Sequence, residues 1–393
     1  MPGQQVFWSR RSLRLTLRNR VSLRLGAGLL FASTVWAQAG PASEQLRQAQ
    51  ELVLRGKPEQ AITIYKELLQ TFPNNPDLLT DLSIAQFKAR HYQDATEQAK
   101  AALQLRPELA SASLLLGASY VELGEFGAAI PPLKKVLEAQ PKERNAILLL
   151  AQALSGTQQY EEAAEKFQRL SELVPDNPKV WYGLGQSYEK LSKQAPGQRA
   201  HYGELARQAY SRLMELPRSR ESCIHAAELR AESGEWVEAA MEWREALEIA
   251  PGDGRARAGL AWALYRARDY LAALALIDGM EKEGLDSAEL RFLTGASLLN
   301  MEQPDRSIPY LEQAIRADSN FLPAQAGLGQ ALLRTGKAKE AIPHLKAALS
   351  VDEDGSGHFQ LFRAYEAAGQ REAARQALVE YKEFTKQLRL SNP

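Results

Sequence analysis

Apolar and small residues recur along this chain at spacings of three and four, which is the periodicity of one face of an α-helix. The pattern is clearest ahead of four prolines that lie 34 residues apart, at positions 73, 107, 141 and 175. Before the first of them, Ala61, Tyr65 and Leu68 share one helical stripe, and related residues occupy the same offsets before the other three. Each segment is therefore predicted to form an amphipathic helix whose stripe faces the interior.

A second apolar line lies upstream of each stripe and predicts a second helix. One such line fits the pattern W-x2-L-G-x2-Y, with Trp181, Leu184, Gly185 and Tyr188. Asn177 and Pro178 precede it as a capping residue and a first-turn proline. This pattern is the first-helix signature of the tetratricopeptide repeat (TPR). The chain resembles that family over almost its whole length after residue 39.

The resemblance implies an all-α, right-handed α-solenoid of about ten helix-turn-helix units within residues 40–383, followed by a tail at 384–393. We place the units at about 42–75, 76–109, 110–143, 144–177, 178–219, 220–253, 254–287, 288–321, 322–354 and 355–383. The fifth unit carries about nine extra residues near 193–203. This insertion predicts either a longer helix pair with a lengthened turn, or a docking projection or bend.

The Gly-x-Gly at Gly183 and Gly185 raises the question of a phosphate-binding loop. A dinucleotide loop needs a third glycine three residues later, after a strand, but that position holds Tyr188 and no strand pattern precedes it. We interpret Gly185 instead as a packing glycine, where the two helices of a pair approach closely. The equivalent glycines are Gly117, Gly295 and Gly329.

Candidate catalytic and metal-binding groups are sparse. The five histidines are scattered over separate repeats, and neither H-E-x-x-H nor G-x-S-x-G occurs. Cys223 and His225 lie two residues apart, so on a helix they point to different sides, as a core thiol and a partly exposed imidazole would. We therefore expect no catalytic residue, no metal site and no cofactor, and we predict that the protein is not an enzyme.

Function is then expected on a surface. In TPR proteins, first-helix side chains that are not used in the core of the pair line a concave groove for peptides or partner helices. The resemblance projects this groove onto Ile84, Phe87, Leu114, Leu148, Tyr182, Gln186, Trp262, Tyr265 and Phe292. The alternative is that several of these residues pack between adjacent first helices. Trp262 is the most informative, because it falls outside the core pattern.

This reading predicts a non-catalytic protein-binding scaffold with a protein or peptide partner. The alternative is a TPR regulatory subunit of an envelope enzyme or of a secretion or assembly complex. One subset of the family binds a C-terminal carboxylate through Lys and Asn four residues apart. The matching positions here hold other pairs, Leu46 and Gln50, Thr80 and Ile84, or Leu114 and Ala118. The chemistry of that subset is not expected at those positions.

Residues 1–39 differ from the rest of the chain. They contain six arginines and no acidic residue, followed by an apolar run from Leu25 to Trp36 and then Ala37-Gln38-Ala39. This order is typical of a secretory signal peptide, and the run is shorter than the ~20 residues a membrane-spanning helix needs. The prediction is a periplasmic or secreted protein. An inner-membrane anchor formed by an uncleaved signal and a mitochondrial transit peptide are the alternatives.

Removal of residues 1–39 also changes the net charge. Lys and Arg fall from 48 to 42 while Asp and Glu stay at 48, so the net charge becomes about −6. Such a balance argues against a nucleic-acid partner, which would require a basic face.

If residues 1–39 are a cleaved signal, N-terminal sequencing of the protein isolated from its native host should read from Gly40. Residues 1–39 found intact on cytosolic protein would contradict export. The same residues found intact in the membrane fraction would instead identify an uncleaved anchor.

Overall fold

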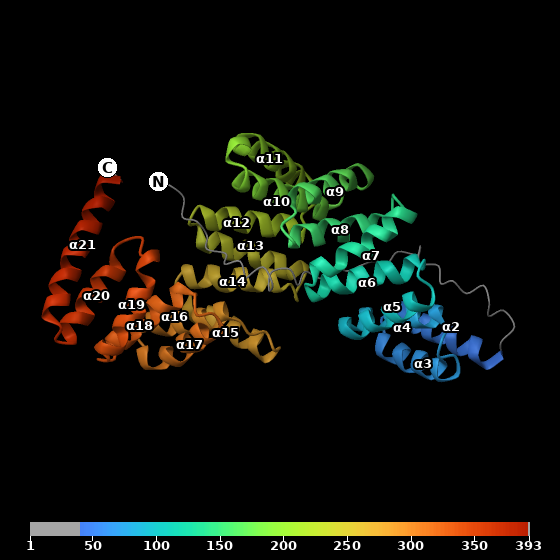
Figure 1. Cartoon of the computed structure of the whole chain (residues 1–393), viewed down its shortest axis with the longest axis horizontal. Coiled ribbons are helices and arrows are strands. Elements are labelled where there is room, and N and C mark those ends of the chain that lie inside the picture. The colour runs from blue at the N-terminus through green and yellow to red at the C-terminus, as the bar shows by residue number, and fades with distance from the viewer. Residues whose placement is uncertain (1–39, 392–393) are drawn as a thin grey trace. The chain divides into compact units, whose positions relative to one another are not determined.

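The computed structural model describes residues 40–391, and every regular element in that range is helical. The α-helices are α2 (Gly40–Leu54), α3 (Pro58–Thr71), α4 (Pro76–Ala89), α5 (Tyr92–Leu105), α6 (Ala110–Leu123), α7 (Phe126–Ala139), α8 (Arg144–Gly156), α9 (Tyr160–Leu173), α10 (Pro178–Gln194), α11 (Arg199–Glu215), α12 (Arg220–Glu232), α13 (Trp236–Ile249), α14 (Gly254–Arg266), α15 (Tyr270–Lys282), α16 (Ala288–Asn300), α17 (Pro304–Ala317), α18 (Leu322–Arg334), α19 (Ala338–Ala348), α20 (Ser356–Ala367) and α21 (Arg371–Ser391). Short 3-10 turns occupy Pro196–Gln198 and Leu349–Val351. Figure 1 shows these helices as consecutive pairs, which confirms the predicted all-α repeat architecture.

The described helices fall into two compact units. The N-terminal unit comprises residues 40–225 together with 249–255, and the C-terminal unit comprises 226–248 and 256–391. Within the N-terminal unit the first helices of successive pairs contact one another in the order α2, α4, α6, α8 and α10. In the C-terminal unit α16, α18 and α20 do the same. We call the side of each unit formed by these first helices, together with α14 in the C-terminal unit, the first-helix face.

The turns inside the pairs repeat with the same period as the sequence pattern. Residues 56, 90, 124 and 158 all have a positive φ, and so do residues 234, 268, 302 and 336. Each series advances by 34 residues. A left-handed residue after a helix ends it and reverses the chain, so this conformation sets where these eight first helices end.

The predicted stripes form the core of the repeats. Ala61, Tyr65 and Leu68 on α3 are buried, and the equivalent side chains of α5, α7 and α9 are buried as well. Helix α4 begins with a capping residue, as expected. The Asn75 side chain accepts hydrogen bonds from the backbone N–H groups of Asp77 and Leu78. Asn177 caps α10 in the same manner through Lys179 N–H.

The glycines act as packing residues, as predicted. A Cβ atom at Gly185 would lie 2.5 Å from Cε1 of Tyr210, and one at Gly183 would lie 2.3 Å from Cζ of Phe167. These separations are too short for any real Cβ contact, so both positions admit only glycine without repacking. The Gly-x-Gly therefore serves helix packing on both sides of α10.

The insertion near 193–203 lengthens the fifth pair. Helices α10 and α11 contain 17 residues each, whereas most of the other helices contain 13 or 14. The rings of Tyr188 and Tyr202 stack across the added length with centroids 6.2 Å apart. At the other end of the chain, residues from 384 to 391 continue α21, and Phe384 stacks on His358 at 4.5 Å.

The glycine contacts can be tested by substitution. Gly117→Leu and Gly329→Leu should each destabilise the fold, because a Cβ there would lie 2.5 Å from Leu133 Cγ or 2.6 Å from Leu345 Cγ. Overpacking costs about 1–3 kcal/mol, which exceeds the ~1 kcal/mol that leucine gains over glycine in a helix. Thermal or urea unfolding measures the difference.

Gly127→Leu is the matched control, because Gly127 lies on α7 with no heavy atom within 4 Å of a built Cβ. That variant should be as stable as the parent protein or more stable. Equal stability of all three variants would contradict the packing role of Gly117 and Gly329.

Candidate functional site: the first-helix face

Four of the predicted groove residues lie in the N-terminal unit and are buried. Ile84 and Phe87 on α4, Leu114 on α6 and Leu148 on α8 are each less than a tenth exposed. Three of them belong to the same hydrophobic cluster, and Leu148 belongs to the next. In this structure they fill the space between neighbouring helices. The sequence left this open as the alternative to a position in the groove.

The other two predicted residues of this unit form a polar group on α10. The Tyr182 side chain is buried, whereas Gln186 is partly exposed one turn later. With its amide oxygen turned toward Arg255, Gln186 accepts hydrogen bonds from both Nη atoms of Arg255 at 3.0 and 3.1 Å, and from the Tyr182 hydroxyl at 2.9 Å. The Arg255 guanidinium also lies 5.3 Å from the centroid of the Tyr182 ring. The structure thus joins both predicted residues to an arginine that the sequence did not single out.

A buried ion-pair network lies beside this group in the same unit. Arg220, the first residue of α12, donates through Nη1 to Asp253 at 2.9 Å and through Nη2 to Glu221 at 2.5 Å. All three side chains are nearly inaccessible to water. Buried ion pairs need partners for all their donors, because the surrounding protein does not replace water. Here the Nε of Arg220 is buried and has no hydrogen-bond partner.

His225 differs from its predicted environment. It is buried rather than partly exposed, and its ring stacks on Tyr210 with centroids 3.7 Å apart. Burial lowers the pKa of His225 to about 4, so the imidazole is neutral near pH 7. The prediction of a partly exposed imidazole was wrong, because Tyr210 on the extended helix α11 covers the ring. Cys223 is buried, as expected of a core thiol.

In the C-terminal unit, the structure brings the three predicted aromatic residues together. Trp262 and Tyr265 on α14 lie 6.0 Å apart, and Phe292 on α16 lies 5.9 Å from Trp262 and 6.2 Å from Tyr265, measured between ring centroids. Phe292 is buried, whereas Trp262 and Tyr265 are partly buried and pack against the same hydrophobic cluster. The Trp262 and Tyr265 rings therefore combine a packed side with an accessible one, which suits an anchoring position.

Asp81 on α4 is a polar group of the N-terminal unit that sequence reasoning missed. Gln50 on α2 donates to its Oδ2 at 3.3 Å, and Asp77 lies close by in an ion pair with Arg106. Burial, followed by the charge of Asp77, raises the pKa of Asp81 to about 7. Burial, and after it the charge of Asp81, raises the pKa of Tyr65, whose buried hydroxyl has no hydrogen-bond partner.

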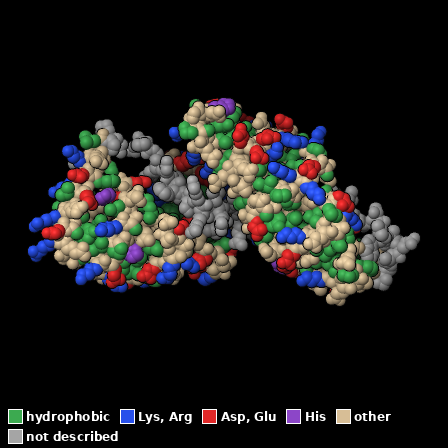
Figure 2. Space-filling model, viewed as in Figure 1, with side chains coloured by type: hydrophobic (Ala, Val, Ile, Leu, Met, Phe, Trp, Pro, Cys, Tyr) green, Lys and Arg blue, Asp and Glu red, His purple; other side chains and the backbone are tan. Residues whose placement is uncertain are grey.

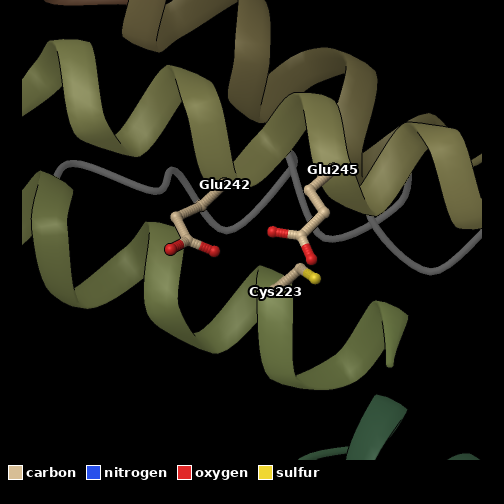
Figure 3. A group of neighbouring side chains, drawn as sticks. All are labelled: Cys223, Glu242 and Glu245. Carbon is tan, nitrogen blue, oxygen red and sulfur yellow. The ribbon is translucent and has the colours of Figure 1, made fainter. Parts of the chain in front are cut away.

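Potential metal ligands do not form a centre inside either unit. Cys223 comes from α12, and Glu242 and Glu245 come from neighbouring turns of α13 (Figure 3). The cysteine belongs to the N-terminal unit and the two glutamates to the C-terminal unit. Among residues 40–391, neither unit by itself holds three such side chains at one point.

The surface charge of the visible faces is mixed. Figure 2 shows acidic and basic side chains interspersed, with hydrophobic side chains scattered between them. No helix described between residues 40 and 391 has both the length and the apolar character needed to cross a bilayer.

These features define a helical-repeat protein built from consecutive helix pairs. Models of the tetratricopeptide repeat match residues 52–116, 120–186 and 292–358, together about half of the chain. The chain belongs to the tetratricopeptide repeat family.

Among known proteins, the chain is 25% identical over 327 residues to the TPR repeat-containing protein YpiA of Bacillus subtilis, covering 75% of this chain and 76% of that one. It is 29% identical over 137 residues to the BBSome complex member BBS4 of Bos taurus, covering 34% of this chain and 26% of that one. Among solved structures, MamA of Desulfovibrio magneticus RS-1 is 28% identical and matches with a TM-score of 0.40, covering 44% of this chain and 94% of that one. A tetratricopeptide repeat protein of Parabacteroides merdae is 17% identical, with a TM-score of 0.37 and coverage of 74% and 98%.

The raised pKa of Asp81 predicts a pH-dependent stability. Between about pH 4 and 7 the folded protein binds more protons at this site than the unfolded chain, so stability falls as the pH rises through that range. Asp81→Asn removes the titrating group but keeps an acceptor for Gln50. We expect the variant to exceed the parent protein in stability at pH 8 by the order of 1–3 kcal/mol.

The advantage should shrink toward zero below about pH 3, where the carboxyl of the parent protein is protonated in both the folded and the unfolded state. Urea unfolding of both proteins at several pH values measures the difference. Glu97→Gln on the exposed side of α5 is the control and should show no such trend. A stability difference that does not change with pH would contradict the assignment.

Proposed function

We propose that this protein is a non-catalytic scaffold that binds partner proteins on its first-helix face after export from the cytoplasm. The observation that carries the proposal is a set of partly exposed polar and aromatic side chains on first helices. Gln186, Trp262 and Tyr265 are each partly exposed and lie beside buried neighbours. In such a repeat array each repeat packs only against the repeats next to it. The remaining surface is extended and can bind a partner.

Within residues 40–391, the surroundings of His225 and His91 support the non-catalytic part of the proposal. His225 is buried, neutral near pH 7 and stacked on Tyr210, so it is poorly placed to exchange protons with a substrate. His91, in the turn between α4 and α5, is exposed, and its Nε2 lies 3.2 Å from Oε1 of Glu59 on α3. Neither histidine has a nucleophile within the contacts of the described residues.

Export rests on the sequence of residues 1–39, which lie outside the described part of the structure. Their arginines, apolar run and small-x-small ending have the order of a cleavable signal. The chain that remains has a single cysteine and therefore needs no disulfide to fold in an oxidising compartment.

The aromatic group of the C-terminal unit provides the test. We expect Trp262→Ala combined with Tyr265→Ala to reduce capture of partner proteins from an envelope extract by roughly thirtyfold, because exposed aromatic anchors contribute about 2 kcal/mol or more. Quantitative mass spectrometry of the captured proteins would be compared between the variant and the parent protein. Melting curves show whether the variant is folded at the temperature of the assay.

Leu271→Ala is the matched control. Leu271 is a large apolar residue that is 71% exposed, but it lies on the second helix α15. Its truncation should leave capture unchanged. Loss of partners in Leu271→Ala, together with normal capture by a folded double variant, would move the binding surface away from the first helices.

A further inference from the structure

Three successive first helices of the C-terminal unit carry a polar, non-acidic side chain at the same repeat position. Arg266 on α14, Asn300 on α16 and Arg334 on α18 each lie two residues before the left-handed residue of their repeat. All three side chains are exposed. In the N-terminal unit the same position holds an apolar residue, a basic residue, an acidic residue and a glycine, at 54, 88, 122 and 156. The polar series is therefore a property of the C-terminal unit and not of the repeat itself.

Uncharged partners hold the guanidinium groups of Arg266 and Arg334 in place. Arg266 lies over the ring of Trp236 on α13, 4.4 Å from its centroid. Arg334 donates through Nη1 to the backbone carbonyl of Leu299 on α16 at 3.1 Å. Within the described residues neither guanidinium has a carboxylate at ion-pair distance. A ring and a carbonyl fix the direction of an arginine but do not neutralise its charge, so both groups keep N–H donors for a further acceptor.

The first helices of this unit carry an excess of positive charge. Between residues 256 and 367, helices α14, α16, α18 and α20 contain five arginines, two glutamates and neither lysine nor aspartate. Two of the arginines, Arg257 and Arg291, are paired with acidic residues that lie outside these helices. Glu228 and Glu232, on the preceding first helix α12, have partners other than Arg266. This face is therefore basic in a chain whose residues after 39 are acidic overall, which favours a negatively charged partner.

Each of the two arginines has a different neighbour on its own helix. Trp262 lies one turn before Arg266 on the same side of α14, and its partly buried ring is 6.0 Å from that of Tyr265. Gln330 lies one turn before Arg334 on α18 and is partly exposed. A segment that crosses these helices would meet a cation and an apolar surface at one end, and a cation and an amide at the other.

The spacing of the two arginines suits an extended segment of a partner. Arg266 and Arg334 are 334 − 266 = 68 residues apart, which is two repeats of 34. Neighbouring helices pack about 8–10 Å apart, so groups on first helices two repeats apart are separated by about 16–20 Å. An extended chain advances about 3.3 Å per residue, so about five or six residues span this distance.

We propose that the first-helix face of the C-terminal unit binds an extended acidic segment of a partner protein, with one carboxylate on Arg266, a second on Arg334 and an apolar side chain on Trp262. The carboxylates belong to aspartate or glutamate residues about five or six positions apart, and each accepts charge-assisted hydrogen bonds from its arginine. This inference rests on the proposed protein-binding function and specifies the chemistry of the partner.

The site can be tested with a random-peptide library displayed on phage, in which no peptide has a free carboxyl terminus. The bait is the protein isolated from its native host. Peptides are kept for study if Trp262→Ala combined with Tyr265→Ala weakens their binding. We expect these peptides to contain two acidic residues about five or six positions apart. Replacing either one by its amide should weaken binding about fivefold or more, because an ion pair in an interface is only partly screened by solvent.

Matched variants of the protein separate this site from general charge effects. Arg266→Gln and Arg334→Gln should each weaken binding of the kept peptides by a similar factor of about five or more. When the matching acidic residue of the peptide is already an amide, the same variant should cause little further loss.

Arg306→Gln is the control for the loss of one arginine. Arg306 is exposed on the second helix α17, donates to Gln303 at 2.6 Å and likewise has no carboxylate at ion-pair distance within the described residues. Its replacement should leave affinity unchanged. Melting curves set the temperature of the assay, so that each variant is compared in its folded state.

Two results would overturn the acidic-segment proposal while leaving the scaffold function intact. One is a set of kept peptides that bind Arg266→Gln and Arg334→Gln as tightly as the parent protein. The other is an equal loss of affinity in Arg306→Gln, since that result assigns the effect to the overall charge of the protein. If no selected peptide depends on Trp262 and Tyr265, the proposed binding surface itself fails, and the acidic-segment proposal fails with it.

Discussion

The close approach of each first helix to the second helices on either side of it is the constraint on which the repeats depend. Leu311 on α17 shows this most directly. A Cβ atom at Gly295 of its own first helix would lie 2.7 Å from Leu311 Cγ, and one at Gly327 of the next first helix would lie 3.2 Å from Leu311 Cδ2. The leucine thus occupies the gap between two glycines of successive repeats. The same arrangement places the Trp243 ring against Gly259 in the C-terminal unit.

This packing explains which features the sequence could predict. The stripes of Ala61, Tyr65 and Leu68, the capping residues and the packing glycines are local, since each depends on spacing within one repeat. Binary pattern, caps and turn residues all favour the same helix pairs, and such agreement is what allows a fold to be inferred from one sequence. The longer fifth pair was foreseeable for the same reason, because its added residues lie within one unit.

The candidate site was less predictable, because its features join different repeats. Arg220 and Asp253 are 33 residues apart, and nothing in the local sequence of either marks the other as a partner. The burial of Ile84 and Leu148 depends on how closely neighbouring first helices approach, which a projection of single-helix positions does not contain. His225 was placed wrongly because its cover, Tyr210, belongs to the preceding pair. Trp262 and Tyr265 are partly buried and pack against the cluster that contains Phe292.

Two charged residues on first helices show how the same desolvation leads to opposite consequences. Asp81 can relieve its burial by taking up a proton, and Gln50 donates to it in either state, so the folded chain accommodates it alone. Lys179 would have to release a proton at a pH where a lysine is normally charged, and its neighbour Arg220 is already committed to two carboxylates. The carboxylates of Glu221, Glu122 and Asp253 oppose that loss of the proton, so the folded chain itself supplies part of the counter-charge. Burial thus disfavours the charged form of both side chains, and the chain offsets that cost by protonation at Asp81 and by neighbouring acidic groups at Lys179.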